Sequence, residues 1–213
     1  MVGGPHLSIM RSRVLSECRE IDFGIAMEGE ETIVDLCQEK KTIPEIGGLI
    51  FREGEEITVN PAKDFISDLD TVPFPKYEKF ELKKYVPEKF IITSRGCPYE
   101  CTFCAARPSV GSRIRLRSAE NILEEILYWY KKGYRQFNFV DDNFTINRKR
   151  VYKLCDLIER EGLNDLFLLC TNGIRADRAD KDLLSRMRQV GFQCIYFGVE
   201  GGNNRILGIL KKG

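Results

Sequence analysis

Three cysteines lie close together in the stretch Cys97-Pro-Tyr-Glu-Cys101-Thr-Phe-Cys104. Three thiolates on one short loop can bind three corners of an iron–sulfur cubane, whereas an electron-transfer cluster normally has four protein ligands. The fourth iron would then stay open to another ligand. The alternative is structural zinc, but zinc normally takes four ligands, and the only histidine, His6, is far away in the sequence. The ligand count favours a 4Fe-4S cluster at Cys97, Cys101 and Cys104.

The same loop resembles the signature loop of the radical S-adenosylmethionine (SAM) superfamily, with its Cys-x3-Cys-x2-Cys spacing and the aromatic Phe103 before the third cysteine. The resemblance implies an enzyme that reductively cleaves SAM to a 5'-deoxyadenosyl radical, with the cofactors carrying the difficult chemistry. It places Phe103 at the cofactor and requires an electron donor such as flavodoxin or ferredoxin. We assign no catalytic side chain from the sequence.

The other five cysteines are isolated in the sequence, and those inside apolar runs are expected to be small buried hydrophobic residues. They are Cys18, Cys37, Cys155, Cys170 and Cys194, of which the last three lie in such runs. The chain has neither a secretory pattern nor an apolar stretch long enough to span a membrane, so we expect a cytoplasmic location. The 33 basic residues nearly balance the 32 acidic ones, which predicts no affinity for nucleic acid.

From Lys89 onward the pattern alternates between short apolar strands and amphipathic helices. Strands are predicted at residues 90–94, 137–140, 166–171 and 194–199, and helices at 118–132, 148–161 and 181–190, with another helix starting near Asn204. This alternation predicts right-handed crossovers and a parallel sheet. The expected fold class is α/β, with about four βα units of a radical-SAM type (βα) barrel. Four units do not close a barrel.

Polar residues follow the later strands, at the rim where βα barrels build their active sites. They are Asp141 and Asp142 after the second strand, Asn172 after the third, and Glu200 after the fourth. The resemblance implies that Asp141 and Asp142 approach the methionine amino group of SAM and that Glu200 approaches its ribose or methionine end. Asp and Asn after a strand are also ordinary helix caps, so both roles stay open here.

The N-terminal part resembles radical SAM enzymes that carry a cobalamin-binding domain. Gly3 and Gly4 would be the glycine pair that receives the nucleotide tail of cobalamin, because glycine lets the backbone approach a ligand closely. Met27 departs from this pattern, since the family often has glycine there. A strand at residues 21–26, a helix to about Gln38 and a hairpin of residues 49–51 and 57–59 are predicted.

The expected division is a remnant of a Rossmann-like cobalamin domain at 1–46, a hairpin and linker at 47–88, and an incomplete radical SAM core at 89–213. Both ends look cut, so we expect a fragment that would hold cobalamin only within its full-length protein. A small molecule is the expected substrate, with methyl transfer and ring closure as candidate reactions. The alternatives are a methylthiotransferase without cobalamin and a non-catalytic iron–sulfur or zinc module.

Overall fold

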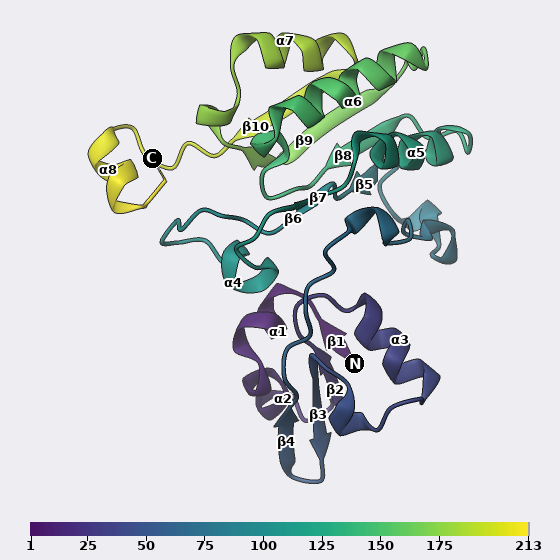
Figure 1. Cartoon of the computed structure of the whole chain (residues 1–213), viewed down its shortest axis with the longest axis vertical. Coiled ribbons are helices and arrows are strands. Elements are labelled where there is room, and N and C mark those ends of the chain that lie inside the picture. Colours follow the sequence, from purple (N-terminus) through teal and green to yellow (C-terminus); the bar gives the residue numbers. More distant parts are fainter. Residues whose placement is uncertain (213) are drawn as a thin grey trace. The chain divides into compact units, whose positions relative to one another are not determined.

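The computed structural model describes residues 1–212, which form two compact units (Figure 1). The first unit combines Met1–Ser67 with Gly96–Arg113, and the second combines Asp68–Arg95 with the chain from Ile114 onward. The chain therefore leaves the second unit at Arg95 and returns to it at Ile114. The three clustered cysteines lie in this segment, Gly96–Arg113.

The second unit contains the predicted parallel sheet. Its strands are β5 (Lys89–Ile91), β8 (Gln136–Phe139), β9 (Phe167–Ile174) and β10 (Phe192–Phe197). They are ordered β10-β9-β8-β5, every neighbouring pair is parallel, and Phe90 lies opposite Asn138 in the register. The α/β class with four parallel strands is confirmed.

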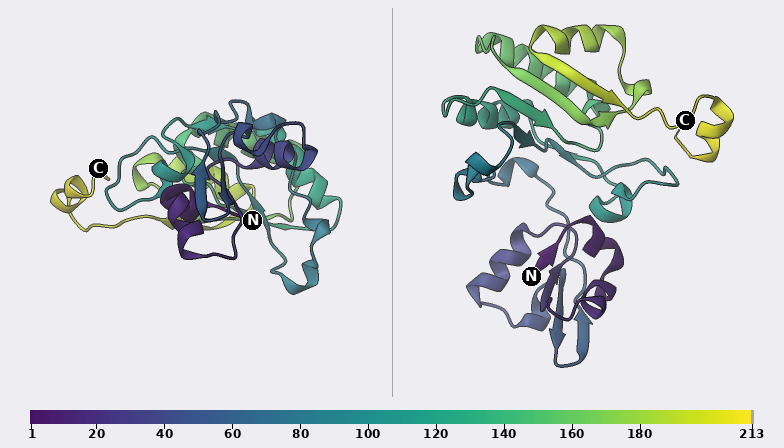
Figure 2. Two further views of the ribbon diagram at one scale, coloured as in Figure 1. Left: turned by 90° about the horizontal axis from the view of Figure 1, so that it is seen from below. Right: turned by 180° about the vertical axis from the view of Figure 1, so that it is seen from behind.

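Three helices lie along one face of this sheet (Figure 1, Figure 2). They are α5 (Ala119–Tyr130), α6 (Arg148–Arg160) and α7 (Lys181–Gln189). Each begins with a side chain that accepts a backbone N–H, namely Ser118 from Asn121, Asn147 from Arg150 and Asp180 from Leu183. Such caps satisfy amides that have no partner within the helix. Helix α8 (Asn204–Ile209) begins where predicted but has no buried residue.

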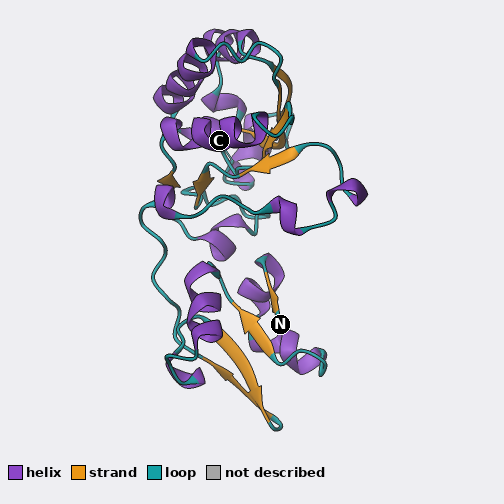
Figure 3. Cartoon of the chain, turned by 90° about the vertical axis from the view of Figure 1, so that its right-hand side faces the viewer, coloured by secondary structure: helices purple, strands orange, loops and turns teal. Residues whose placement is uncertain are grey.

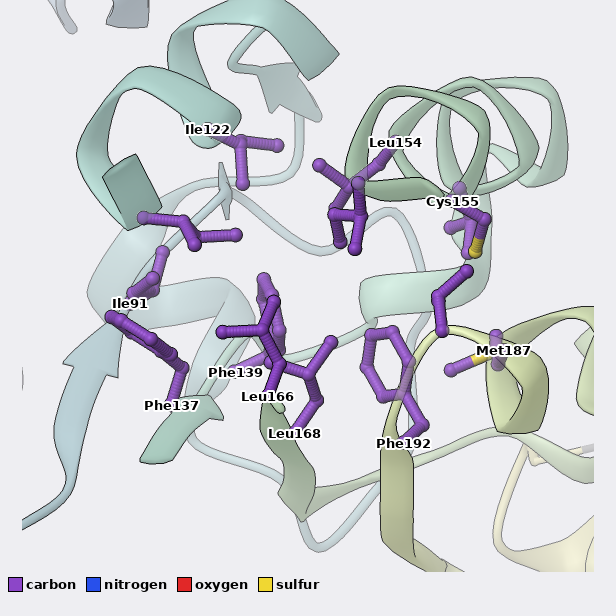
Figure 4. Close-up of a cluster of buried hydrophobic side chains, with 14 of the residues drawn as sticks. Ile91, Ile122, Phe137, Phe139, Leu154, Cys155, Leu166, Leu168, Met187 and Phe192 are labelled. Carbon is purple, nitrogen blue, oxygen red and sulfur yellow. The ribbon is translucent and has the colours of Figure 1, made fainter. Parts of the chain in front are cut away.

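The core of the second unit fills the space between the sheet and these helices (Figure 4). Phe192 extends from β10 toward Met187 on α7, and Phe137 lies next to Ile91 of β5. The rings of Phe139 and Phe192 stack with their centroids 5.4 Å apart. Burial of each such side chain contributes about 1.5–3 kcal/mol, so the helices are held by their apolar faces.

The first unit has its own four-stranded sheet, which Figure 3 shows in orange. Its strands are β1 (Val2–Gly3), β2 (Phe23–Ile25), β3 (Leu49–Glu53) and β4 (Glu56–Val59), in the order β1-β2-β3-β4. The β1–β2 pair is parallel and the other pairs are antiparallel. The predicted hairpin is therefore confirmed as β3–β4, and it shares one sheet with β1 and β2.

Helix α3 (Glu30–Gln38) follows β2 as predicted, whereas α1 (Pro5–Met10) and α2 (Ser12–Glu17) were not predicted. The side chains of Leu7 on α1 and Leu15 on α2 are completely buried. They pack on Gly24, where a β-carbon would lie 2.9 Å from Leu7. Met27 has φ +63°, a left-handed conformation that suits glycine better than methionine.

Single 3-10 turns connect many of these elements. They are η1 (Ile43–Glu45), η2 (Leu69–Thr71), η3 (Tyr77–Lys79), η4 (Leu82–Lys84), η5 (Phe144–Ile146) and η6 (Ala176–Arg178). Within residues 1–212, no helix combines the length and the apolar character that crossing a bilayer requires.

Candidate functional site

A short antiparallel ribbon closes the loop that carries the three cysteines. Strand β6 (Ser94–Arg95) pairs with β7 (Arg115–Leu116), and the residues between them form the cysteine loop (residues 96–113). The sequence predicted Ser94 as the end of the first sheet strand. That strand ends at Ile91 in the structure, and Thr93 turns its amide and hydroxyl toward Asp141 instead.

Backbone hydrogen bonds shape the cysteine loop from within. The Cys97 amide donates to the carbonyl of Gly111 (3.0 Å), and the Cys104 amide donates to that of Cys101 (3.1 Å). Gly111 has φ +85°, and a β-carbon there would lie 2.8 Å from the ring of Phe65. The amide of Ala106, at the start of α4 (Ala106–Val110), donates to the Cys104 sulfur (3.4 Å). This donor would stabilise negative charge on the sulfur.

The three thiols are accessible donors. Cys97 and Cys101 are half-buried, Cys104 is exposed, and none of the eight cysteines of the chain, all within the described residues, forms a disulfide. Three thiols of this kind on one loop suit iron in a cluster. The described part of the chain contains no group of three Cys, His, Asp or Glu side chains already gathered as a metal site.

Asp141 lies inside the second unit, where its carboxylate is fully engaged. One oxygen accepts the Thr93 amide (2.5 Å), and the other accepts the hydroxyls of Thr93 and Ser94, the latter at 2.8 Å. The Arg150 guanidinium lies 3.7 Å from the same carboxylate. Of the two predicted acids after β8, Asp141 thus joins the end of β8 to Thr93 and Ser94, whereas Asp142 is exposed to solvent.

Asp142 is exposed to solvent on one side and crowded by protein on the other. Partial desolvation, followed by repulsion from the adjacent Asp141 carboxylate, raises the pKa of Asp142. Asn172 was predicted to follow its strand, but β9 continues to Ile174 and includes it. Its side-chain amide donates to the carbonyls of Val140 (3.2 Å) and Asp141 (3.1 Å). The structure therefore brings Asn172 to the segment of Asp141 and Asp142.

Glu200 follows β10 in a left-handed conformation, with φ +50°. Such a conformation is strained for a residue other than glycine and is frequent at functional sites. Its carboxylate pairs with Lys212 at 2.5 Å, and Arg175 donates to the carbonyl of Lys212 (2.7 Å). The end of the described chain is therefore tied to the loop that follows β10.

One polar group next to Asp142 was missed by sequence reasoning. Asn143 is only 2% exposed, and neither its amide nitrogen nor its amide oxygen has a hydrogen-bond partner. The hydroxyl of Thr145 is buried without a partner as well. Buried polar atoms normally find a partner, so these atoms offer hydrogen bonds to a ligand or an ordered water. The residue types gave no signal, because Asn after a strand is an ordinary cap.

The remaining predicted site residues belong to the first unit. Phe103 is 53% exposed on the cysteine loop. Gly4 has φ +95°, and a β-carbon placed on it would meet no atom within 4 Å, whereas one on Gly3 would lie 3.5 Å from the Ile25 carbonyl. The turn after β1 thus favours glycine at position 4 because of its positive φ, and the space beside its α-carbon is open.

Protein relatives match nearly the whole chain. An uncharacterized methyltransferase of Pyrococcus horikoshii is 32% identical over 100% of this chain and 48% of its own length. An anaerobic magnesium-protoporphyrin IX monomethyl ester cyclase of Cereibacter sphaeroides is 29% identical over 100% of this chain and 37% of its own length. The chain therefore spans less than half the length of these two relatives.

Solved structures share the fold. The radical SAM methyltransferase TsrM of Kitasatospora setae, solved with cobalamin and a [4Fe-4S] cluster bound, matches 97% of this chain and 43% of its own length, with a TM-score of 0.80 and 20% identity. The cobalamin-dependent SAM radical enzyme OxsB, solved with aqua-cobalamin, matches 99% of this chain and 32% of its own length, with a TM-score of 0.78 and 22% identity.

The family model described as the Radical SAM superfamily matches residues 91–213, from the end of β5 onward. This match includes all three clustered cysteines and every strand of the parallel sheet after β5. The chain belongs to the Radical SAM superfamily.

Proposed function

We propose that this protein holds a [4Fe-4S] cluster through Cys97, Cys101 and Cys104 and uses it to cleave SAM reductively. The observation that carries the proposal is the family match over residues 91–213, which includes a loop with three accessible thiols and no disulfide. A cluster held there would supply one electron for breaking a carbon–sulfur bond of SAM, which would give methionine and a 5'-deoxyadenosyl radical.

The residues of the chain bind and orient these groups. The three thiolates hold iron, and the Ala106 amide supports the charge on the Cys104 sulfur. Phe103 supplies an exposed ring for the adenosyl part of SAM. Asp142, with Asn172 and Glu200 at the ends of the neighbouring strands, provides polar groups for the methionine and ribose. Asp141 acts with them by fixing the backbone at the end of β8.

We further propose that the full-length protein combines this cleavage with cobalamin, for methyl transfer or ring closure on a small molecule. The names of two relatives, a methyltransferase and a cyclase, support both reactions. The open face of Gly4 supports the approach of a large ligand to the first unit. The reductant would be a flavodoxin or ferredoxin. Eight cysteines without a disulfide fit the reducing cytoplasm, where we propose that the protein works.

A putative methylthiotransferase of Methanocaldococcus jannaschii is also a relative, at 28% identity over 91% of this chain. A second iron–sulfur cluster would need further ligands, however, and the first unit offers only Cys18 and Cys37 as cysteines outside the cysteine loop. Both are exposed single residues. We therefore favour the cobalamin-type reaction over methylthiolation.

The ligand assignment can be tested by alkylation of the folded protein before and after anaerobic cluster assembly. Without a cluster, iodoacetamide should modify the exposed and half-buried thiols, while Cys155 stays unmodified because burial raises the pKa of its thiol to about 12. With a cluster, Cys97, Cys101 and Cys104 should become protected, as peptide mass spectrometry will show. Cys18 and Cys37 serve as controls that must stay reactive. Equal labelling of the three cysteines in both states would reject them as ligands.

A further inference from the structure

The two strands that enter and leave the cysteine loop form a neck (residues 93–95 and 115–117). Ribbon pairing joins Ser94 to Leu116 and Arg95 to Arg115. One step beyond the ribbon, the amide of Arg117 donates to the carbonyl of Thr93 (2.9 Å). All residues of the neck belong to the second unit.

A single buried guanidinium contacts both strands of the neck. Nη1 of Arg150, on α6, donates to the carbonyl of Thr93 (2.6 Å) and to that of Arg117 (3.4 Å). Nη2 donates to the carbonyl of Phe144 (3.3 Å). The side chain of Arg150 is only 7% exposed. A planar group with several donors can bridge carbonyls in this way, whereas the single ammonium of lysine cannot reproduce the same geometry.

Two carboxylates complete the buried network. Asp141 accepts from Thr93 and Ser94 on the entering strand and balances the charge of Arg150. On the leaving strand, Arg117 pairs with the buried Glu125 (2.5 Å) and donates to the carbonyl of Ile92 (3.0 Å). Burying four charged groups is costly, and two well-packed apolar pairs would often be as stable. Stability alone is therefore a weak reason for this network.

We propose that Arg150 and Asp141 are positioning residues for the iron–sulfur cluster, because they fix the neck from which all three cysteines are presented. This inference rests on the proposed function. Three cysteines on one loop can hold a cluster in a single geometry only if the two ends of that loop are kept at a constant separation, as the ribbon and Arg150 keep them. With a loosened neck, the same thiols would still bind iron, but the cluster would be held less tightly and in more than one geometry.

The test compares reconstituted Arg150→Lys and Ser94→Ala proteins with a matched control, Ile158→Val. Ile158 is a buried residue of the same helix α6 and belongs to the apolar core. We expect all three variants to assemble a cluster. Arg150→Lys should then lose iron to an added chelator about tenfold faster than wild type, as residues that orient metal ligands typically affect metal affinity. Ser94→Ala should show a smaller increase, and Ile158→Val should match wild type.

The electron paramagnetic resonance (EPR) spectrum of the reduced cluster provides a second readout, which should broaden in Arg150→Lys and not in Ile158→Val. If Arg150→Lys does not fold, as far-UV circular dichroism would show, Ser94→Ala alone decides. Iron loss and EPR spectra equal to those of Ile158→Val would overturn the positioning role while leaving the proposed function intact. Wild-type protein that takes up no iron–sulfur cluster would instead overturn the proposed function.

Discussion

Replacing any one of Cys97, Cys101 and Cys104 by alanine should reduce the iron bound after anaerobic reconstitution to less than about a tenth of the wild-type amount. A cubane with only two protein thiolates is poorly held. The three thiols are the accessible sulfur donors of one loop. Backbone hydrogen bonds hold two of these residues within the loop, from the Cys97 amide to the Gly111 carbonyl and from the Cys104 amide to the Cys101 carbonyl. Iron and sulfide analysis, together with the visible iron–sulfur absorption, measures the loss.

The matched controls are Cys18→Ala and Cys37→Ala, which remove exposed thiols of the first unit outside the cysteine loop. These variants should retain wild-type iron. If one of them loses the cluster and Cys101→Ala keeps it, then the ligand set has been assigned to the wrong residues. The variants should otherwise fold as wild type does, because none of the five side chains is fully buried.

Gly191→Ala should strongly destabilise the second unit. Gly191 connects α7 to β10 with φ +107°, and a β-carbon there would lie 2.5 Å from the carbonyl oxygen of Leu166. This clash is with backbone, which cannot rotate away as a side chain could. Its own carbonyl accepts the amide of Leu168 (2.8 Å), so any movement of Gly191 also disturbs the start of β9. We expect the free energy of unfolding to fall by about 3 kcal/mol or more, because the costs of backbone strain and of overpacking add together.

Gly133→Ala is the control, because Gly133 also has a left-handed conformation, with φ +94°, but a β-carbon there would meet no atom within 4 Å. It should cost only about 1–2 kcal/mol, the penalty for a left-handed alanine. Urea denaturation followed by tryptophan fluorescence reports on this unit, since Trp129 is the only tryptophan and is buried in its core. Equal losses for the two variants would show that the turn at Gly191 adapts to a side chain.

The parallel sheet and its helices could be predicted because their apolar residues repeat with a clear period. On α6, for example, Val151, Leu154, Cys155 and Ile158 recur at helical spacing in the sequence, and all four are buried. Helices α1 and α2 are too short to show such a repeat, and the close packing of Leu7 on Gly24 joins residues that are separated in the sequence. Cys170 is buried as expected, but Cys194 is only partly buried because β10 is at the edge of the sheet.

The candidate site was predictable where a spacing has few chemical explanations, as with the three cysteines. The role of Asp141 could not be predicted, because a carboxylate after a strand can face a ligand or bind backbone amides, and only the fold shows that it accepts from Thr93. Arg150 gave no signal either, since an arginine in the first turn of a helix is usually solvated. Its contacts with Thr93 and Arg117 join segments far apart in the sequence.

The central claim is that three cysteines hold a cubane whose fourth iron is free to bind SAM. The most direct test is the EPR spectrum of the reduced, anaerobically reconstituted protein, recorded with and without SAM after its metal content has been measured. We expect about four iron and four sulfide per chain, as three clustered thiolates without a fourth protein ligand imply, and a spectrum that changes when SAM is added. Tightly bound zinc without iron–sulfur absorption, or a cluster whose spectrum is the same with saturating SAM, would contradict the claim.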